Sequence, residues 1–225
     1  MPADAPRLVD LSHPIRDGMP VYPGDPEVSI GPALTVDADG VDVARIRMGS
    51  HTGTHIDAPS HTVRGGRTMA DVGLDELVGE AIVLRVPELV DGEVYDWDRL
   101  EAHGSLPAQL PPIVLIDTGW ARWFDDERRR RHPALAAAAA EELLRRGMRV
   151  LGVDTLSPDS TEVAPPAEAG AGAAFPVHEA VLGSGRLIVE NVANLDAVPD
   201  RVRVGFFPLR LAGDGAPVRA VAFLD

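Results

Sequence analysis

Short apolar segments rich in β-branched residues recur along the chain from residue 81 onwards, and they constrain the fold more than any other feature of the sequence. Each segment has the length of a β-strand, and several are continuously apolar rather than alternating with polar residues. Continuous apolar runs are typical of strands that are buried on both faces of a sheet. The predicted strands cover residues 81–86, 113–116, 150–153, 187–189, 202–206 and 218–223.

Helical patterns lie between these predicted strands. The clearest is the alanine- and leucine-rich stretch 134–146, which Gly147 is placed to terminate. Shorter helical patterns cover residues 96–103 and 176–182. Strands and helices that alternate over this length, with no repeat and no linker between them, predict a single α/β domain over residues 1–225.

Two further segments carry only structural predictions. Residues 165–172 are rich in proline, alanine and glycine, and we expect a mobile surface loop there. Residues 128–131 are four consecutive arginines, preceded by acidic residues and followed by a helical pattern. This run is typical of a solvated helix face rather than of a nucleic-acid-binding patch.

Composition excludes several kinds of chemistry. The chain has no cysteine, so disulfides, thiolate metal sites and cysteine nucleophiles are excluded. All 21 basic residues are arginine, and the absence of lysine removes Schiff-base chemistry and the P-loop lysine. Polar chemistry must therefore come from histidine, carboxylate and hydroxyl side chains.

Charge and hydropathy argue against two classes of partner. The formal net charge of −14 disfavours nucleic acids and anionic membrane surfaces, because both require a basic binding surface. No stretch approaches the roughly 18 uninterrupted apolar residues of a membrane span. The first ten residues, with acids and prolines, do not resemble an export signal, so we expect a cytoplasmic protein.

Three of the seven histidines lie within residues 51–61, and their spacing suggests a metal site. On a regular helix Asp57 would point away from His51 and His55, and on a regular strand the two histidine backbones would be about 13 Å apart. A bend between them removes both problems, and Gly53 is the residue that can make it. We therefore expect a kinked strand-to-loop segment in which His51, His55 and Asp57 surround a divalent cation.

His61 lies beyond this triplet because Pro59 interrupts the segment. It could face the same ion from outside its ligand shell, where a general base belongs. A lone histidine in such a turn would more simply be structural. Three histidines and an aspartate within eleven residues, around a glycine pivot, favour the metal site instead.

Two candidate ligands stand far down the chain. His178 begins a short helical pattern, and Glu190 directly follows a predicted buried strand. A carboxylate at that position needs a positive partner, because burying an unpaired charge is costly. Arg186 and a metal ion are both candidates for that partner, and taken singly His178 and Glu190 also fit structural roles.

The remaining histidines and several acids receive no assigned role in the site. His13, His103 and His132 read as turn or helix-end residues. Ligating histidines usually donate their second N–H to a carboxylate or carbonyl oxygen. Candidate acids for this orienting role are Asp25, Asp117 and Asp154, and the sequence does not choose among them.

At the histidine cluster the sequence resembles the cyclase-like metal hydrolase family, whose best-known members are bacterial kynurenine formamidases. The family motif His-x-Gly-Thr-His-x-Asp-x-Pro-x-His matches residues 51–61 at every characteristic position. The resemblance extends over nearly the whole chain. Further matching segments are residues 9–12, 22–26, 116–120 and 152–155, with His178, Glu190 and Asn191 in the later part.

The resemblance implies a metal centre of one or two ions, with zinc expected and manganese as the alternative. His51, His55 and Asp57 look like ligands of one metal, and Asp57 would bridge to a second metal held by His178 and Glu190. It also implies a compact α/β domain of the swivelling β/β/α type, with a mixed sheet and flanking helices, assembled as a homodimer or higher homo-oligomer.

The implied activity is hydrolysis of an aryl N-formyl amide, a small-molecule substrate, by metal-bound hydroxide with His61 as general acid and base. Bacterial kynurenine formamidases commonly have tryptophan where this chain has Tyr22, which would line the substrate pocket. A hydrolase that opens a cyclic amide or lactone, such as isatin, is the alternative. A non-catalytic metal-binding protein is a third reading.

Overall fold

The computed structural model of the chain describes residues 7–102, 106–161 and 175–224. His103 and the predicted loop 165–172 lie outside the described residues. Within them, no helix combines the length and the apolar character that crossing a membrane would require.

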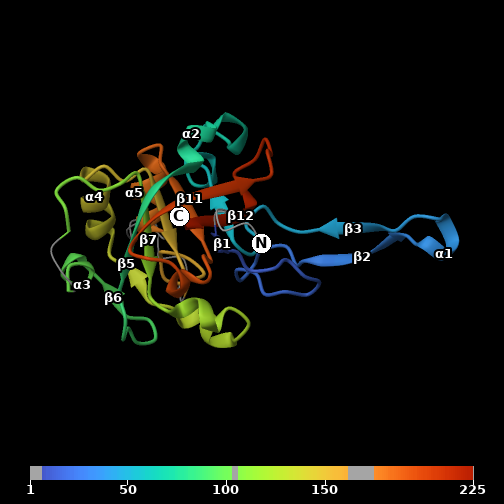
Figure 1. Cartoon of the computed structure of the whole chain (residues 1–225), viewed down its shortest axis with the longest axis horizontal. Coiled ribbons are helices and arrows are strands. Elements are labelled where there is room, and N and C mark those ends of the chain that lie inside the picture. Colours follow the sequence, from blue (N-terminus) through green and yellow to red (C-terminus); the bar gives the residue numbers. More distant parts are fainter. Residues whose placement is uncertain (1–6, 103–105, 162–174, 225) are drawn as a thin grey trace, which may run out of the picture.

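A mixed eight-stranded sheet forms the centre of the molecule (Figure 1). The strands β5, β7, β9 and β10 run parallel to one another, and the other strands of the sheet join antiparallel. Their order is β1 (Arg7–Asp10), β12 (Gly215–Leu224), β11 (Arg201–Pro208), β5 (Val78–Arg85), β7 (Ile113–Asp117), β9 (Val150–Val153), β10 (Leu187–Glu190) and β4 (His55–Asp57).

The sheet closes into a ring because β4 also pairs with the first part of β12. The same strand β12 pairs with β1 along its second part, so β1 and β4 share one edge of β12. β4 is therefore held on both sides, by β10 and by β12. This closure brings a three-residue strand from the early part of the chain between two strands from its end.

The parallel strands bury both of their faces, as their continuous apolar sequences predicted. In β5, Ala81 and Val83 face the interior of the ring, whereas Ile82 and Leu84 belong to a second core beneath the helices. Alternating side chains of a strand point to opposite faces, so one strand contributes to both cores. Helices pack on the second core (Figure 1): α3 (Trp97–Leu100), α4 (Ala137–Arg145) and α5 (Pro176–Gly183).

All six predicted strands and all three predicted helices are present. The prediction for 134–146 was wrong at its start, because Ala134 and Leu135 form the short strand β8 (Ala134–Leu135), which pairs with β6 (Val94–Tyr95). The helix α4 consequently begins at Ala137. Short elements without long apolar patterns complete the fold: α2 (Leu74–Leu77) and the 3-10 helices η1 (Pro59–His61), η2 (Met69–Asp71), η3 (Trp120–Trp123), η4 (Glu127–Arg131) and η5 (Leu195–Ala197).

A two-stranded arm projects from the body, and the sequence analysis did not predict it (Figure 1). It consists of β2 (Ser29–Leu34) and β3 (Val43–Arg47), joined at the far end by α1 (Val36–Asp39). Its base is anchored by a small core in which Val28 is buried with Met19 and Phe124. We refer to residues 29–47 as the arm.

The arginine run 128–131 is only partly solvated, so this prediction was wrong in one respect. Arg129 is buried, and its guanidinium donates to the Asp126 carbonyl. Arg128 lies over the rings of Trp120 and Trp123, at 5.0 and 4.6 Å from the ring centroids. The two tryptophan rings thus hold Arg128, and the Asp126 carbonyl holds Arg129.

Candidate metal centre

Strand pairing places three of the predicted ligands side by side. β4 carries His55 and Asp57, and in the antiparallel register with β10 His55 lies directly opposite Glu190. Directly opposed residues of an antiparallel pair have Cβ atoms roughly 5 Å apart, so their side chains meet. All three side chains are buried. Glu190, at the buried end of β10, thus faces His55.

A bend at Gly53 brings His51 to the same place. Gly53 has φ of +63°, a left-handed conformation that glycine adopts without strain, and regular strand structure begins only at His55. The predicted hinge is therefore present, although His51 lies in a loop rather than on a kinked strand. A second glycine, Gly215, makes room for the imidazole ring of His51. Any residue with a Cβ at this position would collide with the ring, because that Cβ would lie 2.8 Å from His51 Cε1.

The helix α5 supplies His178 from the far part of the chain. Asp159 accepts the backbone N–H groups of Val177 and His178, and its Oδ2 also accepts the His178 Nδ1–H at 2.7 Å. This arrangement fixes the ring so that Nε2 points toward Glu190 Oε1 at 3.3 Å and Asp57 Oδ2 at 3.7 Å. A carboxylate behind a histidine is the usual support of a metal-ligating imidazole.

The five side chains form two overlapping groups that share Asp57. Possible ligand atoms lie within 4.8 Å of one another in the group of His51, His55 and Asp57, and again in the group of Asp57, His178 and Glu190. His51 Nδ1 is 2.7 Å from Asp57 Oδ1, and His55 Nε2 is 3.3 Å from the same oxygen. His55 donates its Nδ1–H to the Gly53 carbonyl at 2.9 Å, which leaves Nε2 facing the carboxylates.

Buried polar atoms in this cluster test whether a cation fits it. Within the described residues, His55 Nε2, Asp57 Oδ2 and Glu190 Oε1 are buried and have no hydrogen-bond partner. An unpaired buried polar atom costs on the order of 1–3 kcal/mol, so three at one place are unusual. Imidazole nitrogen and carboxylate oxygen are the ligands that zinc and manganese accept. The residues therefore fit a divalent cation.

The pKa shifts of the cluster also fit a site for a divalent cation. Burial lowers the pKa of His55, but Asp57 and Glu190 raise that pKa well above its usual value. The carboxylates around His178 likewise outweigh its burial and raise its pKa. Burial raises the pKa of Asp57, but His55 and the other histidines hold it well below the usual range. The carboxylates thus favour the protonated form of these imidazoles, and a cation bound at the same nitrogens would take the place of those protons.

His61 lies at the mouth of the cluster, at the end of η1. Its ring centroid is 4.0 Å from that of His51, and its Nδ1 is 3.5 Å from Asp214 Oδ2. The His61 side chain is 31% exposed, against 4% for His55. Burial lowers the pKa of His61 by more than the nearby Asp57 raises it. A neutral imidazole at pH 7 that is reachable from solvent can accept a proton.

A cavity of about 190 Å³ opens onto the cluster. Aromatic rings from three separate segments line it together with the predicted ligands: Tyr22, Phe124 and Phe175. Asp25 is also in the lining, and its burial raises its pKa. The cavity thus brings aromatic rings together with a cluster of imidazoles and carboxylates.

The sequence analysis missed the two carboxylates that contact the histidines from behind. These are Asp159, described above, and Asp214, whose Oδ2 lies 3.0 Å from His51 Nε2. Asp214 comes from the turn before β12, and His51, His61 and Asp214 form a third group with ligand atoms within 4.8 Å. A single feature could have pointed to it: Asp214 lies between two glycines, a turn signal shortly before the predicted strand 218–223.

The three acids that the sequence suggested do not hydrogen-bond to the ligand histidines. Asp117 pairs with Arg85 at 2.6 Å, and Asp154 accepts the Thr118 hydroxyl at 2.7 Å. Neither of these contacts a predicted ligand, and Asp25 lines the cavity without bonding to a ligand histidine. Asp117 ends β7 and Asp154 directly follows β9, whereas Asp25 lies in a turn between β1 and β2.

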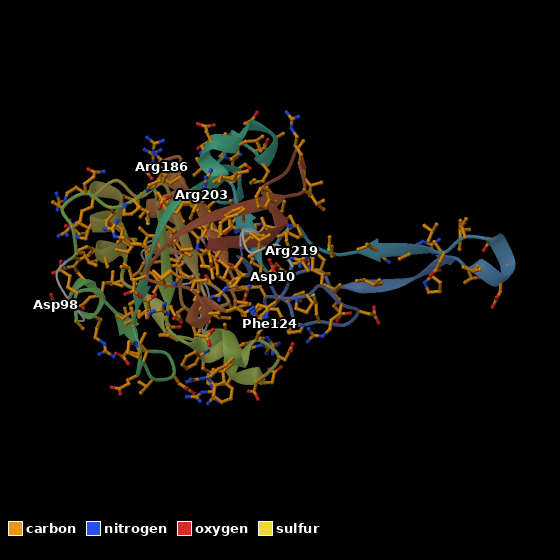
Figure 2. All side chains as sticks on the ribbon, viewed as in Figure 1. Asp10, Asp98, Phe124, Arg186, Arg203 and Arg219 are labelled. Atoms are coloured by element: carbon orange, nitrogen blue, oxygen red, sulfur yellow. The ribbon has the colours of Figure 1, made fainter. Side chains whose placement is uncertain are left out.

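Two other sequence predictions concern residues near the centre. Arg186 is not the partner of Glu190, because it precedes β10 and Glu190 ends it. Figure 2 shows Arg186 at the rim of the body, far from Phe124, which lines the cavity. His13 stacks on Phe124 and His132 hydrogen-bonds to Thr161, and neither belongs to the ligand groups.

Comparison with known proteins places this geometry in a family. Residues 9–160 match the protein family described as "Cyclase: Putative cyclase". A kynurenine formamidase from Paracidovorax citrulli is 33% identical over 226 residues, covering 96% of this chain and 96% of that protein. A kynurenine formamidase from Salinibacter ruber is 30% identical over 217 residues, covering 95% of this chain and 96% of that protein.

Solved structures share the fold over almost the whole chain. An isatin hydrolase A from Ralstonia solanacearum superposes with a TM-score of 0.81 at 25% sequence identity, covering 98% of this chain and 92% of that chain. The mixed sheet with flanking helices is therefore the architecture of these hydrolases as well. Because the family match spans more than half of the chain and the relatives align along nearly all of it, the chain belongs to the Cyclase family.

Proposed function

We propose that this chain is a metal-dependent hydrolase that cleaves the C–N bond of an aryl N-formyl amide. One observation carries the proposal: Asp57 is shared between two buried groups of histidine and carboxylate, and an aromatic cavity opens directly onto both. The similarity to kynurenine formamidases supports the choice of reaction and substrate class.

The residues that would hold the cations follow from the two groups. His51, His55 and Asp57 would hold one ion, and Asp57, His178 and Glu190 a second. A bound divalent ion supplies Lewis acidity, which lowers the pKa of water toward 7 and polarises a carbonyl group. We propose zinc, with manganese as the alternative, because both accept this set of ligands. The partner carboxylates Asp159 and Asp214 would keep the imidazoles oriented.

His61 would move the proton in this reaction. Its lowered pKa leaves the imidazole neutral near pH 7, so it can accept a proton from the attacking water and return it to the departing amine. Asp214 lies beside His61 Nδ1 and would stabilise the imidazolium that forms between the two steps. The exposure of His61 lets it exchange this proton with solvent.

The cavity wall suits a planar aromatic substrate. Tyr22, Phe124 and Phe175 can stack on or edge against an aryl ring, and such pairs contribute about 0.5–1.5 kcal/mol each beyond the area they bury. The reacting carbonyl would then lie toward the cluster of histidines and carboxylates.

A cyclic amide such as isatin is the second candidate substrate. The similarity to isatin hydrolase A favours it, because the same ligand cluster and aromatic wall would serve a ring-opening hydrolysis. Rates on N-formylkynurenine and on isatin, measured side by side with the same metal-loaded protein, distinguish the two. A protein that turns over neither substrate would support the non-catalytic reading.

The cytoplasmic location and the homo-oligomeric state stay predictions.

The test of the mechanism compares two histidine variants. We expect His61→Ala to keep its metal and to lose turnover by about 10²–10⁴-fold, because it removes only the proton acceptor. In contrast, we expect His178→Ala to lose metal as well as turnover. Metal content is measured by elemental analysis and turnover by product absorbance. Normal turnover in His61→Ala would remove His61 from the mechanism.

A further inference from the structure

Asn191, which directly follows Glu190, has a backbone conformation that is rare for residues other than glycine. Its φ is +56°, in the left-handed region, where asparagine is one of the few other residues found repeatedly. The residue is buried, and it belongs to the wall of the cavity. It is a member of neither of the two ligand groups that share Asp57.

The pairing between β4 and β10 ends at this point. Glu190 lies opposite His55 in the last pair of the antiparallel register. Regular pairing would next place Asn191 opposite Thr54, but the left-handed turn carries the chain out of the strand. The Asn191 N–H donates instead to the Thr155 carbonyl at 3.0 Å. Side chains, rather than the strand ladder, therefore join residue 191 to the hinge at Gly53.

Two buried hydrogen bonds make this junction, one in each direction. The Thr54 hydroxyl donates to the Asn191 carbonyl at 2.6 Å, and Asn191 Nδ2 donates to the Gly53 carbonyl at 3.1 Å. The Thr54 oxygen also accepts the His13 N–H at 2.9 Å, which leaves the hydroxyl proton for Asn191. Residue 191 is thus fastened to two consecutive residues of the hinge.

The Gly53 carbonyl connects this junction to a proposed ligand. Its oxygen accepts the His55 Nδ1–H at 2.9 Å as well as the Asn191 amide, and a carbonyl oxygen has two lone pairs for the two donors. With Nδ1–H held there, His55 Nε2 lies 3.3 Å from Asp57 Oδ1 and 3.2 Å from Glu190 Oε2. The direction of the Gly53 carbonyl therefore decides where His55 Nε2 points.

That direction is not fixed by Gly53 itself. Glycine has no side chain to restrict its backbone, so the peptide group at the hinge can take several orientations. Asn191 removes this freedom, because its amide ties the Gly53 carbonyl to the end of β10. A carbonyl can only accept, so the nitrogen of the amide, and not its oxygen, must face Gly53.

We propose that Asn191 is a positioning residue of the metal centre: its amide locks the Gly53 carbonyl, and this carbonyl orients the ligand His55. The assignment rests on the proposed metal-binding function and adds to it a residue outside both ligand groups. Asparagine meets two requirements here, since it tolerates the left-handed backbone and also supplies an N–H donor. Glycine would meet only the first, and aspartate would meet the first without the donor.

The first test separates the side chain of Asn191 from its backbone conformation. Asn191→Gly keeps the left-handed turn and removes the amide, whereas Asn191→Asp keeps the shape of the side chain but turns an oxygen towards the Gly53 carbonyl. We expect both variants to bind zinc about 10–100-fold more weakly than the unchanged chain, as when the support of a ligating histidine is lost. Isothermal titration calorimetry measures the dissociation constants, and circular dichroism checks the folding.

Asn194→Gly is the matched control for this test. Asn194 is also left-handed, with φ of +54°, and its Nδ2 also donates to a backbone carbonyl, that of Asp10, at 2.8 Å. Because it lies outside the ligand groups, we expect its replacement to leave the zinc affinity unchanged. Equal zinc affinity in Asn191→Gly and the unchanged chain would overturn the assignment alone. An unchanged chain that binds no zinc would overturn the proposed function together with it.

The second test observes the ring of His55 directly, by nuclear magnetic resonance of zinc-loaded protein with labelled histidine. We expect the His55 Nδ1–H to exchange with solvent about tenfold faster in Asn191→Gly, because its acceptor is no longer held. The His178 Nδ1–H, which Asp159 accepts, should exchange at its former rate. Faster exchange of both protons would indicate a general loss of stability and would overturn the assignment, as would an unchanged rate for His55.

Discussion

His13 shows how one residue beside the cavity couples its protonation to folding. Its ring stacks on Phe124, with centroids 3.9 Å apart and an interplanar angle of 9°. Burial lowers the pKa of His13 to about 4, from an ordinary value of 6.5. The folded state thus disfavours the protonated ring, whereas the unfolded chain accepts a proton at about pH 6.5. The stability contributed by neutral His13 is present above pH 6.5 and is lost as the pH falls towards 4.

We therefore expect His13→Phe to be less sensitive to acid than the unchanged chain. Phenylalanine keeps the stack on Phe124 but cannot be protonated. Between pH 7.5 and pH 5 the free energy of unfolding should fall by on the order of 1–2 kcal/mol less in the variant, after allowance for partial solvent screening. Urea unfolding at the two pH values gives this difference. Equal losses in both proteins would contradict the assignment of the pKa shift to His13.

The sequence could predict the site residues whose roles depend only on their neighbours within residues 51–61. Gly53 bends the chain within the motif itself, and its role follows from the spacing of His51 and His55. Gly215 is equally necessary for His51, but the two residues are far apart in the sequence and meet only through the β4–β12 pairing. Asp159 could not be chosen over Asp154 for a similar reason, because only the packed position of α5 decides which acid faces His178.

At the scale of single elements, the start of α5 sets the position of His178. The helix begins with Pro176, and its first turn has no side-chain cap of its own. Asp159 takes over this role from the preceding segment, since its two oxygens accept the N–H groups of Val177 and His178. The same carboxylate holds the ring of His178. One side chain thus caps a helix and orients a proposed ligand.

We expect Asp159→Asn to weaken zinc binding by about 10–100-fold, because an amide neither carries the charge nor fixes the ring as the carboxylate does. Competition with a chromophoric chelator measures the affinity. Asp117→Asn is a suitable control, since Asp117 is paired with Arg85 outside the ligand cluster, and its affinity should match that of the unchanged chain. Equal zinc affinity in the two variants would exclude Asp159 as the support of His178.

Elements with long apolar patterns were predictable, and the shortest ones were not. β9 has the predicted bounds, because four buried apolar residues define a strand without reference to its neighbours. β8 has two residues and exists only through its pairing with β6. The arm was missed for another reason: its strands face solvent, so no buried partner imposes the continuous apolar pattern that identified the central strands.

For the whole molecule, ring closure determines where the site can form. β4 carries two of the proposed ligands and is held between β10 and β12, so the cluster lies where the ring closes. Asp57 and Glu190 are buried close together at this junction, where a bound cation would neutralise their charge. A bound ion would therefore stabilise the closed ring as well as the site.

Metal removal should lower the melting temperature of the protein. Binding at 100 times the dissociation constant stabilises a fold by about 2.7 kcal/mol, which corresponds to roughly 5–10 °C for a chain of this size. Calorimetry of the metal-loaded protein with and without a chelator measures the shift. His178→Ala, which lacks a proposed ligand, should show a much smaller shift. A chelator that leaves the melting temperature of the loaded protein unchanged would show that the ions do not contribute to the fold.

The arm emerges from the cavity wall itself. Asp25, which lines the cavity, lies four residues before β2, and His51 lies four residues after β3. The two ends of the arm are therefore joined, each within four residues, to segments of the chain that line the cavity.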